Sequence, residues 1–234
     1  NQDWERDDGA IKQLLRLPLD TVIFEQYSDF VEKQSAQLNS IDSTESIFFR
    51  ASIGRWLAYN GQYGEALDNL NSVANNLYAI EDTTYLHQVY YWLSQVYQLG
   101  RSNGAKALVY AEQAERIYNQ RQTKDDYFLA KIQYIRGLAY RSIDNEIAID
   151  YFRKDQQLRA DYEGRRENYI TKALLNLRKS EEAYISAKKA LSTYYNTYNA
   201  VNGEYIIFEA LALSQLERYD EAITKINEAL RLIG

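Results

Sequence analysis

The stretch that decides the fold is GQYGEALDNLNSVANNL, residues 61–77, in which a small residue, Ala66, is followed at once by a large one, Leu67. Val73 comes seven positions after Ala66, so both residues lie on one stripe of a helix. Two antiparallel helices approach closely only where the side chains between them are small. The stretch therefore predicts the second helix of a tightly packed helical hairpin, with Ala66 at the seam.

The same pattern returns four times along the chain. It recurs in NGAKALVYAEQAERI (103–117), DNEIAIDYFRKDQQL (144–158), RKSEEAYISAKKAL (178–191) and ERYDEAITKINEALRL (217–232). The anchor alanines of the five segments are separated by 41, 41, 35 and 39 residues, and they are Ala66, Ala107, Ala148, Ala183 and Ala222. Four segments have a small or apolar residue seven positions after the anchor, whereas the third has Asp155 there. A period of this length is typical of a solenoid of repeated hairpins.

An apolar stretch also precedes each anchor, for example Leu93 and Val96 before Ala107. Only 10 glycines and 1 proline interrupt a sequence that is rich in good helix formers. Each repeat is therefore expected to be a helix, a turn and a second helix. We predict an all-α fold of at least ten helices with no β-sheet, in which all five anchor alanines are buried.

The first repeat resembles the tetratricopeptide repeat family, in a long-period form found in bacteria. Its matching residues follow the pattern G-x2-[YL]-x3-G-x-Y-x2-A-x6-[AV], and they are Gly54, Leu57, Gly61, Tyr63, Ala66 and Val73. In the last repeat Glu217 stands where the family has its turn glycine. The spacing from the small residue of the first helix to the anchor is shortest in the third repeat, from Gly137 to Ala148, which predicts a turn that has lost a residue. The resemblance implies about five to six antiparallel hairpins in a right-handed superhelix.

The two ends differ from the middle. Residues 1–42 are expected to form a polar tail and an atypical capping hairpin, with helices over 11–17 and 20–38, and residues 43–234 to form the five repeats. The last helix carries an apolar stripe that includes Ile223, Ile226 and Leu230, with no later residues to cover it. This stripe predicts that the native chain continues into another helix, that two copies meet end to end, or that the first hairpin of a neighbour docks there, and continuation is the favoured expectation.

Composition excludes several classes of function. The net charge of −6 argues against nucleic-acid binding, which needs clustered Lys and Arg. No apolar run reaches the length of a membrane span, and the absence of cysteine removes thiolate chemistry and Cys-bound zinc. The single histidine, His87, is expected at the surface or at a helix start. No cofactor or catalytic motif is present, so we expect neither a cofactor nor a metal, and we expect that the chain is not an enzyme.

In the family that these residues resemble, the first helix of each repeat lines a concave groove that holds a peptide. Carried onto this sequence, the groove-facing positions are Arg55, Tyr59, Tyr91, Gln95, Gln98, Tyr134, Arg141, Asn168, Lys172 and Asn176. Amide side chains pair with the backbone of an extended peptide, and tyrosines supply area and a hydroxyl. The alternative is that Tyr91 and Tyr134 are seam residues and Arg55 is a solvated charge.

The residues and the resemblance leave three classes of function open. The leading hypothesis is a non-catalytic module that binds a protein or peptide. The second is the sensory domain of a larger bacterial signalling protein whose output domain lies outside this chain. The third, an enzyme, has no motif to support it.

Overall fold

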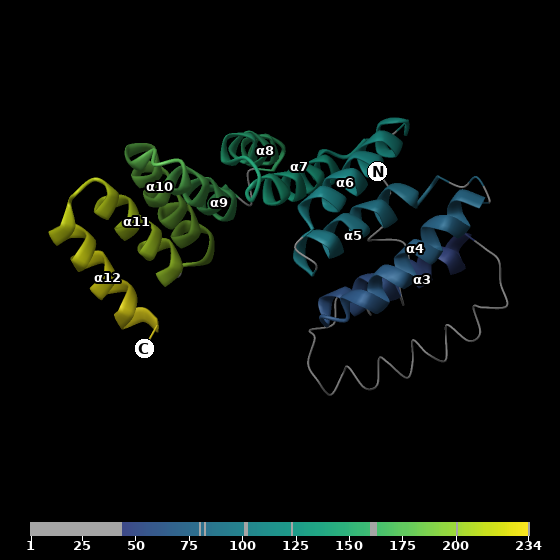
Figure 1. The fold of residues 1–234 in the computed structure, drawn as a ribbon, viewed down its shortest axis with the longest axis horizontal. Coiled ribbons are helices and arrows are strands. Elements are labelled where there is room, and N and C mark those ends of the chain that lie inside the picture. Colours follow the sequence, from purple (N-terminus) through teal and green to yellow (C-terminus); the bar gives the residue numbers. More distant parts are fainter. Residues whose placement is uncertain are drawn as a thin grey trace. The chain divides into compact units, whose positions relative to one another are not determined.

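A computed structural model describes residues 44–79, 81, 83–100, 103–122, 124–159, 163–199 and 201–233 (Figure 1). The predicted capping hairpin within residues 1–42 lies outside these residues. The described residues form ten α-helices and no strand, as the sequence predicts. The helices are α3 (Thr44–Tyr59), α4 (Tyr63–Ala79), α5 (Leu86–Leu99), α6 (Gly104–Asn119), α7 (Asp126–Tyr140), α8 (Asn145–Leu158), α9 (Glu163–Asn176), α10 (Ser180–Tyr198), α11 (Gly203–Gln215) and α12 (Tyr219–Ile233).

The chain divides into two compact units at a boundary that follows Asp82. The first unit contains the hairpin α3–α4. The second contains the hairpins α5–α6, α7–α8, α9–α10 and α11–α12, and each of these hairpins packs against the next one. Among the described residues, no helix combines the length and the apolar character that crossing a membrane requires.

All five anchor alanines are buried, which confirms the predicted register. Each anchor is the fourth residue of the second helix in its hairpin, and each is at most 3 % exposed. Its backbone N–H donates to the carbonyl of the residue just before the helix, as Ala107 does to Asn103 and Ala148 does to Asp144. The anchor therefore closes the first turn of the helix at the point where the two helices come closest.

A small residue of the first helix faces this seam. A Cβ atom at Gly137 would lie 2.5 Å from the Phe152 ring, and a Cβ atom at Gly54 would lie 2.7 Å from Leu70. In the second repeat the Ser94 hydroxyl donates to the carbonyl of the anchor itself, Ala107, at 2.7 Å. Small residues on both helices thus allow the close approach that the repeat pattern predicts.

The prediction of a shortened third turn is wrong. The turn between α7 and α8 covers residues 141–144, and it is one residue longer than the turn at 60–62 in the first repeat. The short spacing arises inside the helix, because α7 ends three residues after Gly137 whereas α3 ends five residues after Gly54. Asp144 caps the next helix, since its side chain accepts hydrogen bonds from the N–H groups of Glu146 and Ile147.

Asp155, the residue that breaks the repeat pattern, is fully buried between two arginines. Arg159 donates to it through Nε at 3.1 Å and through a terminal nitrogen at 2.8 Å, and the Nε of Arg166 donates to its other oxygen. Both guanidinium groups are themselves buried, and they lie over the rings of Tyr127 and Tyr134. A buried carboxylate is tolerated here because both of its oxygens are paired with cations.

Of the two expected positions for His87, the helix start is the one found, because the residue lies in the first turn of α5 and not at the surface. The side chain is only 7 % exposed, and its ring packs against Tyr118 and Phe128 at centroid distances of 5.5 and 4.9 Å. Arg121 lies 3.3 Å from the ring nitrogens and also donates to the carbonyl of Thr84. Burial and, to a smaller extent, the charge of Arg121 lower the pKa of His87 to about 3.

Candidate functional site

The first helices of the second unit form its inner row. Besides the contacts between sequential helices, α5 packs against α7, and α9 packs against α11. Figure 1 shows α5, α7, α9 and α11 following one another along one side of this unit, with α6, α8, α10 and α12 along the other. Side chains on the free face of the first helices therefore share one surface, which we call the inner face.

Tyr169 of α9 is the centre of a cluster on this face. The Tyr134 hydroxyl of α7 donates to the Tyr169 hydroxyl at 3.2 Å, and their ring centroids are 5.7 Å apart. The guanidinium of Arg141 lies 5.4 Å from the Tyr169 ring, and the ammonium of Lys172 lies at the same distance. Three of the ten residues nominated from the sequence, Tyr134, Arg141 and Lys172, are therefore brought together.

The cluster continues onto α11. The Lys172 ammonium lies 4.7 Å from the centroid of Phe208 and 2.9 Å from the carboxylate of Glu204. Tyr134, Tyr169, Lys172 and Phe208 are all half-buried, so each presents part of its surface to solvent. A strip of aromatic rings alternating with cations thus crosses three successive first helices, and we call Tyr134, Arg141, Tyr169, Lys172, Glu204 and Phe208 the inner strip.

Amide side chains form hydrogen bonds between the ends of neighbouring first helices. Gln98 of α5 donates to the carbonyl of Leu138 in the last turn of α7 at 3.3 Å. Gln215, just at the end of α11, makes the equivalent bond to the carbonyl of Leu175 in α9 at 3.2 Å. Carbonyls in the last turn of a helix have no partner within the helix, so these amides satisfy them. Gln98, which the sequence nominates for ligand binding, is thus already engaged in packing.

The remaining nominated residues are dispersed. Tyr91 and Asn168 are 6 % and 5 % exposed, and the Tyr91 ring packs edge-on against Phe128. Gln95 is half-buried on α5, and Asn176 is exposed and donates to the side chain of Asn145 at 3.3 Å. Arg55 and Tyr59 belong to the first unit, where the guanidinium lies 5.4 Å from the Tyr59 ring.

Sequence reasoning missed Tyr169, Glu204 and Phe208. Tyr169 is three residues before Lys172, so both lie on one stripe of α9, and a search of that stripe would have found it. Glu204 and Phe208 have an i, i+4 relation on α11, but no nominated residue on that helix pointed to them.

The chemistry of the inner strip is that of binding. The half-buried rings offer apolar contact through the parts that reach solvent, and the hydroxyls and charges offer hydrogen bonds at fixed positions. Among the described residues no group of three or more His, Cys, Asp or Glu side chains is arranged to hold a metal ion.

Comparisons with known proteins agree with the helical-repeat architecture. No family model and no curated protein matches the chain. Among solved structures, the chain is similar to BtubC (BKLC) from P. vanneervenii, with 13% identity, 91% of each chain covered and a TM-score of 0.72. It is also similar to the TPR-like repeats of a kinesin light chain from Podosopora anserina (16% identity, 79% of this chain and 92% of that one, TM-score 0.64). A third similar structure is MamA from AMB-1 (19% identity, 81% and 93% coverage, TM-score 0.57).

These similarities show the fold. The chain is a tetratricopeptide-like solenoid of antiparallel helical hairpins.

Proposed function

We propose that this protein is a non-catalytic scaffold that binds an extended segment of a partner protein along the inner face of α5, α7, α9 and α11. The observation that carries the proposal is the convergence of Tyr134, Arg141 and Lys172 on Tyr169, which gathers aromatic and cationic groups of two successive hairpins on one face. Tyrosine and arginine are among the residue types that contribute most to binding at protein interfaces.

The geometry favours an extended peptide as the ligand. The strip runs across the helices rather than along one of them, and its polar groups recur from helix to helix. An extended peptide presents backbone N–H and C=O groups at regular intervals, which hydroxyls and cations spaced in this way can bind. The structural similarities do not favour the alternative of a sensory domain.

A crosslinking experiment tests the proposal. A photoreactive phenylalanine analogue placed at Gln95, a half-buried position of α5 that the sequence nominates for the groove, should capture a partner from a lysate of the native source. The same analogue at Lys188, an exposed position on α10, serves as the control. Mass spectrometry then identifies the captured segment, which is synthesised for a direct binding measurement.

The variants Tyr169→Ala and Arg141→Gln should each weaken binding of that synthetic segment by about tenfold or more. Tyr195→Ala, which removes an exposed tyrosine of α10, should leave the affinity unchanged. Equal crosslinking at Lys188, or unchanged affinity in both inner-strip variants with the fold intact by circular dichroism, would refute binding at this face.

The last hairpin carries a second candidate contact surface. Ile223, Ile226 and Leu230 of α12 are each about half exposed or more, and no described residue covers them. Large exposed apolar patches on proteins mark interaction sites. We propose that two copies of this chain associate through this surface.

A further inference from the structure

The helix α9 carries a second surface on the side opposite to the inner strip. Glu167, Ile170 and Leu174 have i, i+3, i+7 spacing and form one stripe, and Tyr169, Lys172 and Asn176 form another. The two stripes are offset by two residues, which corresponds to about 200° around the helix. The first stripe therefore faces away from the inner strip and toward α8 and α10.

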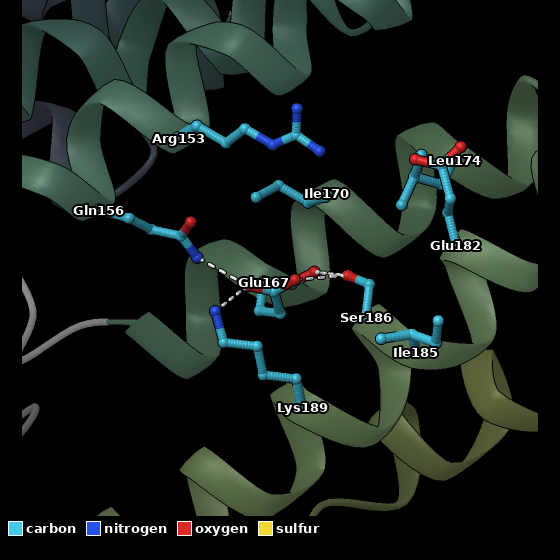
Figure 2. Close-up of a pocket in the computed structure, with 9 residues that line it drawn as sticks. All are labelled: Arg153, Gln156, Glu167, Ile170, Leu174, Glu182, Ile185, Ser186 and Lys189. Carbon is cyan, nitrogen blue, oxygen red and sulfur yellow. Dashed lines mark hydrogen bonds and ion pairs between the residues drawn. The ribbon is translucent and has the colours of Figure 1, made fainter.

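A pocket of about 310 Å³ lies over this stripe, between α8 and α10 (Figure 2). Ile170 and Leu174, each 3 % exposed, are its apolar floor. Ile185 of α10 forms part of the wall and is 65 % exposed, so its side chain is accessible from solvent. The volume is at the small end of the range for ligand pockets, about 300–1,000 Å³, and suits a single amino-acid residue.

At one end of the pocket the charged groups are paired with one another. The carboxylate of Glu167, itself buried, accepts hydrogen bonds from Gln156 at 2.9 Å and from Ser186 at 2.8 Å, and it lies 3.1 Å from the Lys189 ammonium. Figure 2 shows these three side chains converging on it from both walls. Glu167 and Lys189 neutralise one another, so this end offers no net charge to a ligand.

The other end carries a cation available to a ligand. Arg153 of α8 is exposed and lines the pocket, and no described residue accepts a hydrogen bond from it or forms an ion pair with it. In Figure 2 its guanidinium lies beside Ile170, with no interaction drawn to it. An apolar floor next to an unpaired guanidinium is complementary to a ligand that carries an aliphatic group and a carboxylate close together.

We infer that this pocket binds the carboxy-terminal residue of a peptide that ends in an aliphatic amino acid. The side chain lies on Ile170 and Leu174 against Ile185, and the terminal carboxylate pairs with Arg153. Glu182 on the α10 wall, which is exposed, offers an acceptor for a peptide N–H and disfavours a second acidic group.

A carboxy-terminus fits better than an internal Asp or Glu. In a terminal residue the carboxylate and the side chain share one Cα atom, so both can act within a pocket that holds one residue. In an extended peptide the side chains of neighbouring residues point to opposite sides. An acidic residue next to an aliphatic one would therefore point away from Arg153. The site does not depend on the proposed function of the inner face, because it lies on the opposite stripe of α9.

Three peptides test the inference by titration into the whole protein, observed through the methyl NMR signals of Ile170, Leu174 and Ile185. The first is acetyl-Ala-Ala-Leu with a free carboxylate, and the second is the same peptide with a terminal amide. The third is acetyl-Leu-Ala-Asp amide, which has the charge of the first but carries it on an internal side chain. We expect the free acid to shift these signals saturably, with an affinity about tenfold or more above that of either amide.

The variant Arg153→Gln should reduce the affinity for the free acid to that for the amide, while Arg116→Gln, an exposed arginine of α6, should leave the difference intact. Because Arg153 is exposed, its replacement should leave the fold intact, and the methyl spectrum reports on folding directly. Equal binding of free acid and amide, stronger binding of acetyl-Leu-Ala-Asp amide, or an unchanged preference in Arg153→Gln would each overturn the inference.

Discussion

The imidazole of His87 is held neutral by its surroundings, and this makes stability depend on pH. Its pKa of about 3 in the folded chain lies below the ordinary value of 6.5 that it regains on unfolding. Between these values the unfolded chain binds the proton and the folded chain does not, so folding stability is lost as the pH falls from about 6.5 toward 3. The expected slope approaches about 1.4 kcal/mol per pH unit.

The variant His87→Phe should remove this slope, because phenylalanine keeps the ring packing against Tyr118 and Phe128 without a titrating group. Urea unfolding at pH 6.5 and 5.0 measures the difference, in a range where most carboxylates remain ionised. We expect the native protein to lose about 1.6 kcal/mol more than the variant over this interval. Identical losses in the two proteins would show that His87 is accessible to protons in the folded state.

Glu217 stands at a turn position that favours glycine. Its φ angle is +60°, and two of the equivalent turn positions, five residues before the anchors, are also left-handed: Gly61 at +77° and Arg178 at +58°. A left-handed conformation strains any residue with a Cβ atom. Glu217 therefore replaces the glycine of the family pattern while the backbone keeps the left-handed conformation of that turn.

Replacing Glu217 by glycine should therefore stabilise the last hairpin by about 0.5–1 kcal/mol, the relief of strain outweighing the greater freedom of glycine in the unfolded chain. Thermal unfolding measures the change. Glu112→Gly, at an exposed position inside α6, is the matched control and should cost about 1 kcal/mol. A loss of stability in Glu217→Gly would mean that the side chain contributes more than the turn strain removes.

Within a hairpin, the decisive contact is the seam at the anchor alanine. Ala107 is fully buried, and its carbonyl accepts the hydrogen bond from Ser94 of the opposite helix. Ala107→Leu should overpack this seam and cost about 1–3 kcal/mol. Ala105→Leu, two residues earlier on the exposed face of the same helix, should change stability little. Equal denaturation midpoints for the two variants would contradict the packing of α5 against α6.

Structural features that depend on the spacing of residues along the chain can be predicted from the sequence. The anchors recur every 35 to 41 residues and each lies at the same place in its helix, so five separate segments support one register. The burial of His87 was not predictable in this way, because Tyr118 and Phe128 come from two other helices. Tyr169 differs, because its place on the Lys172 stripe of α9 was visible in the sequence, and only its contact with Tyr134, 35 positions away, was not. The pairing of Asp155 with Arg166 likewise crosses from one repeat to the next.

At the scale of the whole molecule, each interior hairpin of the second unit is covered by the next one, whereas within the described part of the chain no helix follows to cover the last. In α8, the residues one and four positions after the anchor are Ile149 and Phe152, which are 5 % and 0 % exposed, and α9 packs against that helix. The residues at the same positions of α12 are Ile223 and Ile226, which are 56 % and 45 % exposed. The difference in burial agrees with the presence of a following hairpin beside α8, which adds to the packing of Phe152 against Gly137 in its own hairpin.

Exposed aliphatic groups of this size favour association, since each buried side chain contributes about 1.5–3 kcal/mol. We expect sedimentation velocity to show self-association that increases with concentration and that Ile226→Glu abolishes. Ile143→Glu is the matched control, because Ile143 is 62 % exposed in the turn between α7 and α8 and does not belong to the apolar stripe of α12. If both variants reduce association equally, general surface hydrophobicity is responsible rather than α12. If the unaltered protein remains a monomer at its highest soluble concentration, the α12 surface does not drive contact between copies, because an apolar face that can pair with itself should do so as concentration rises.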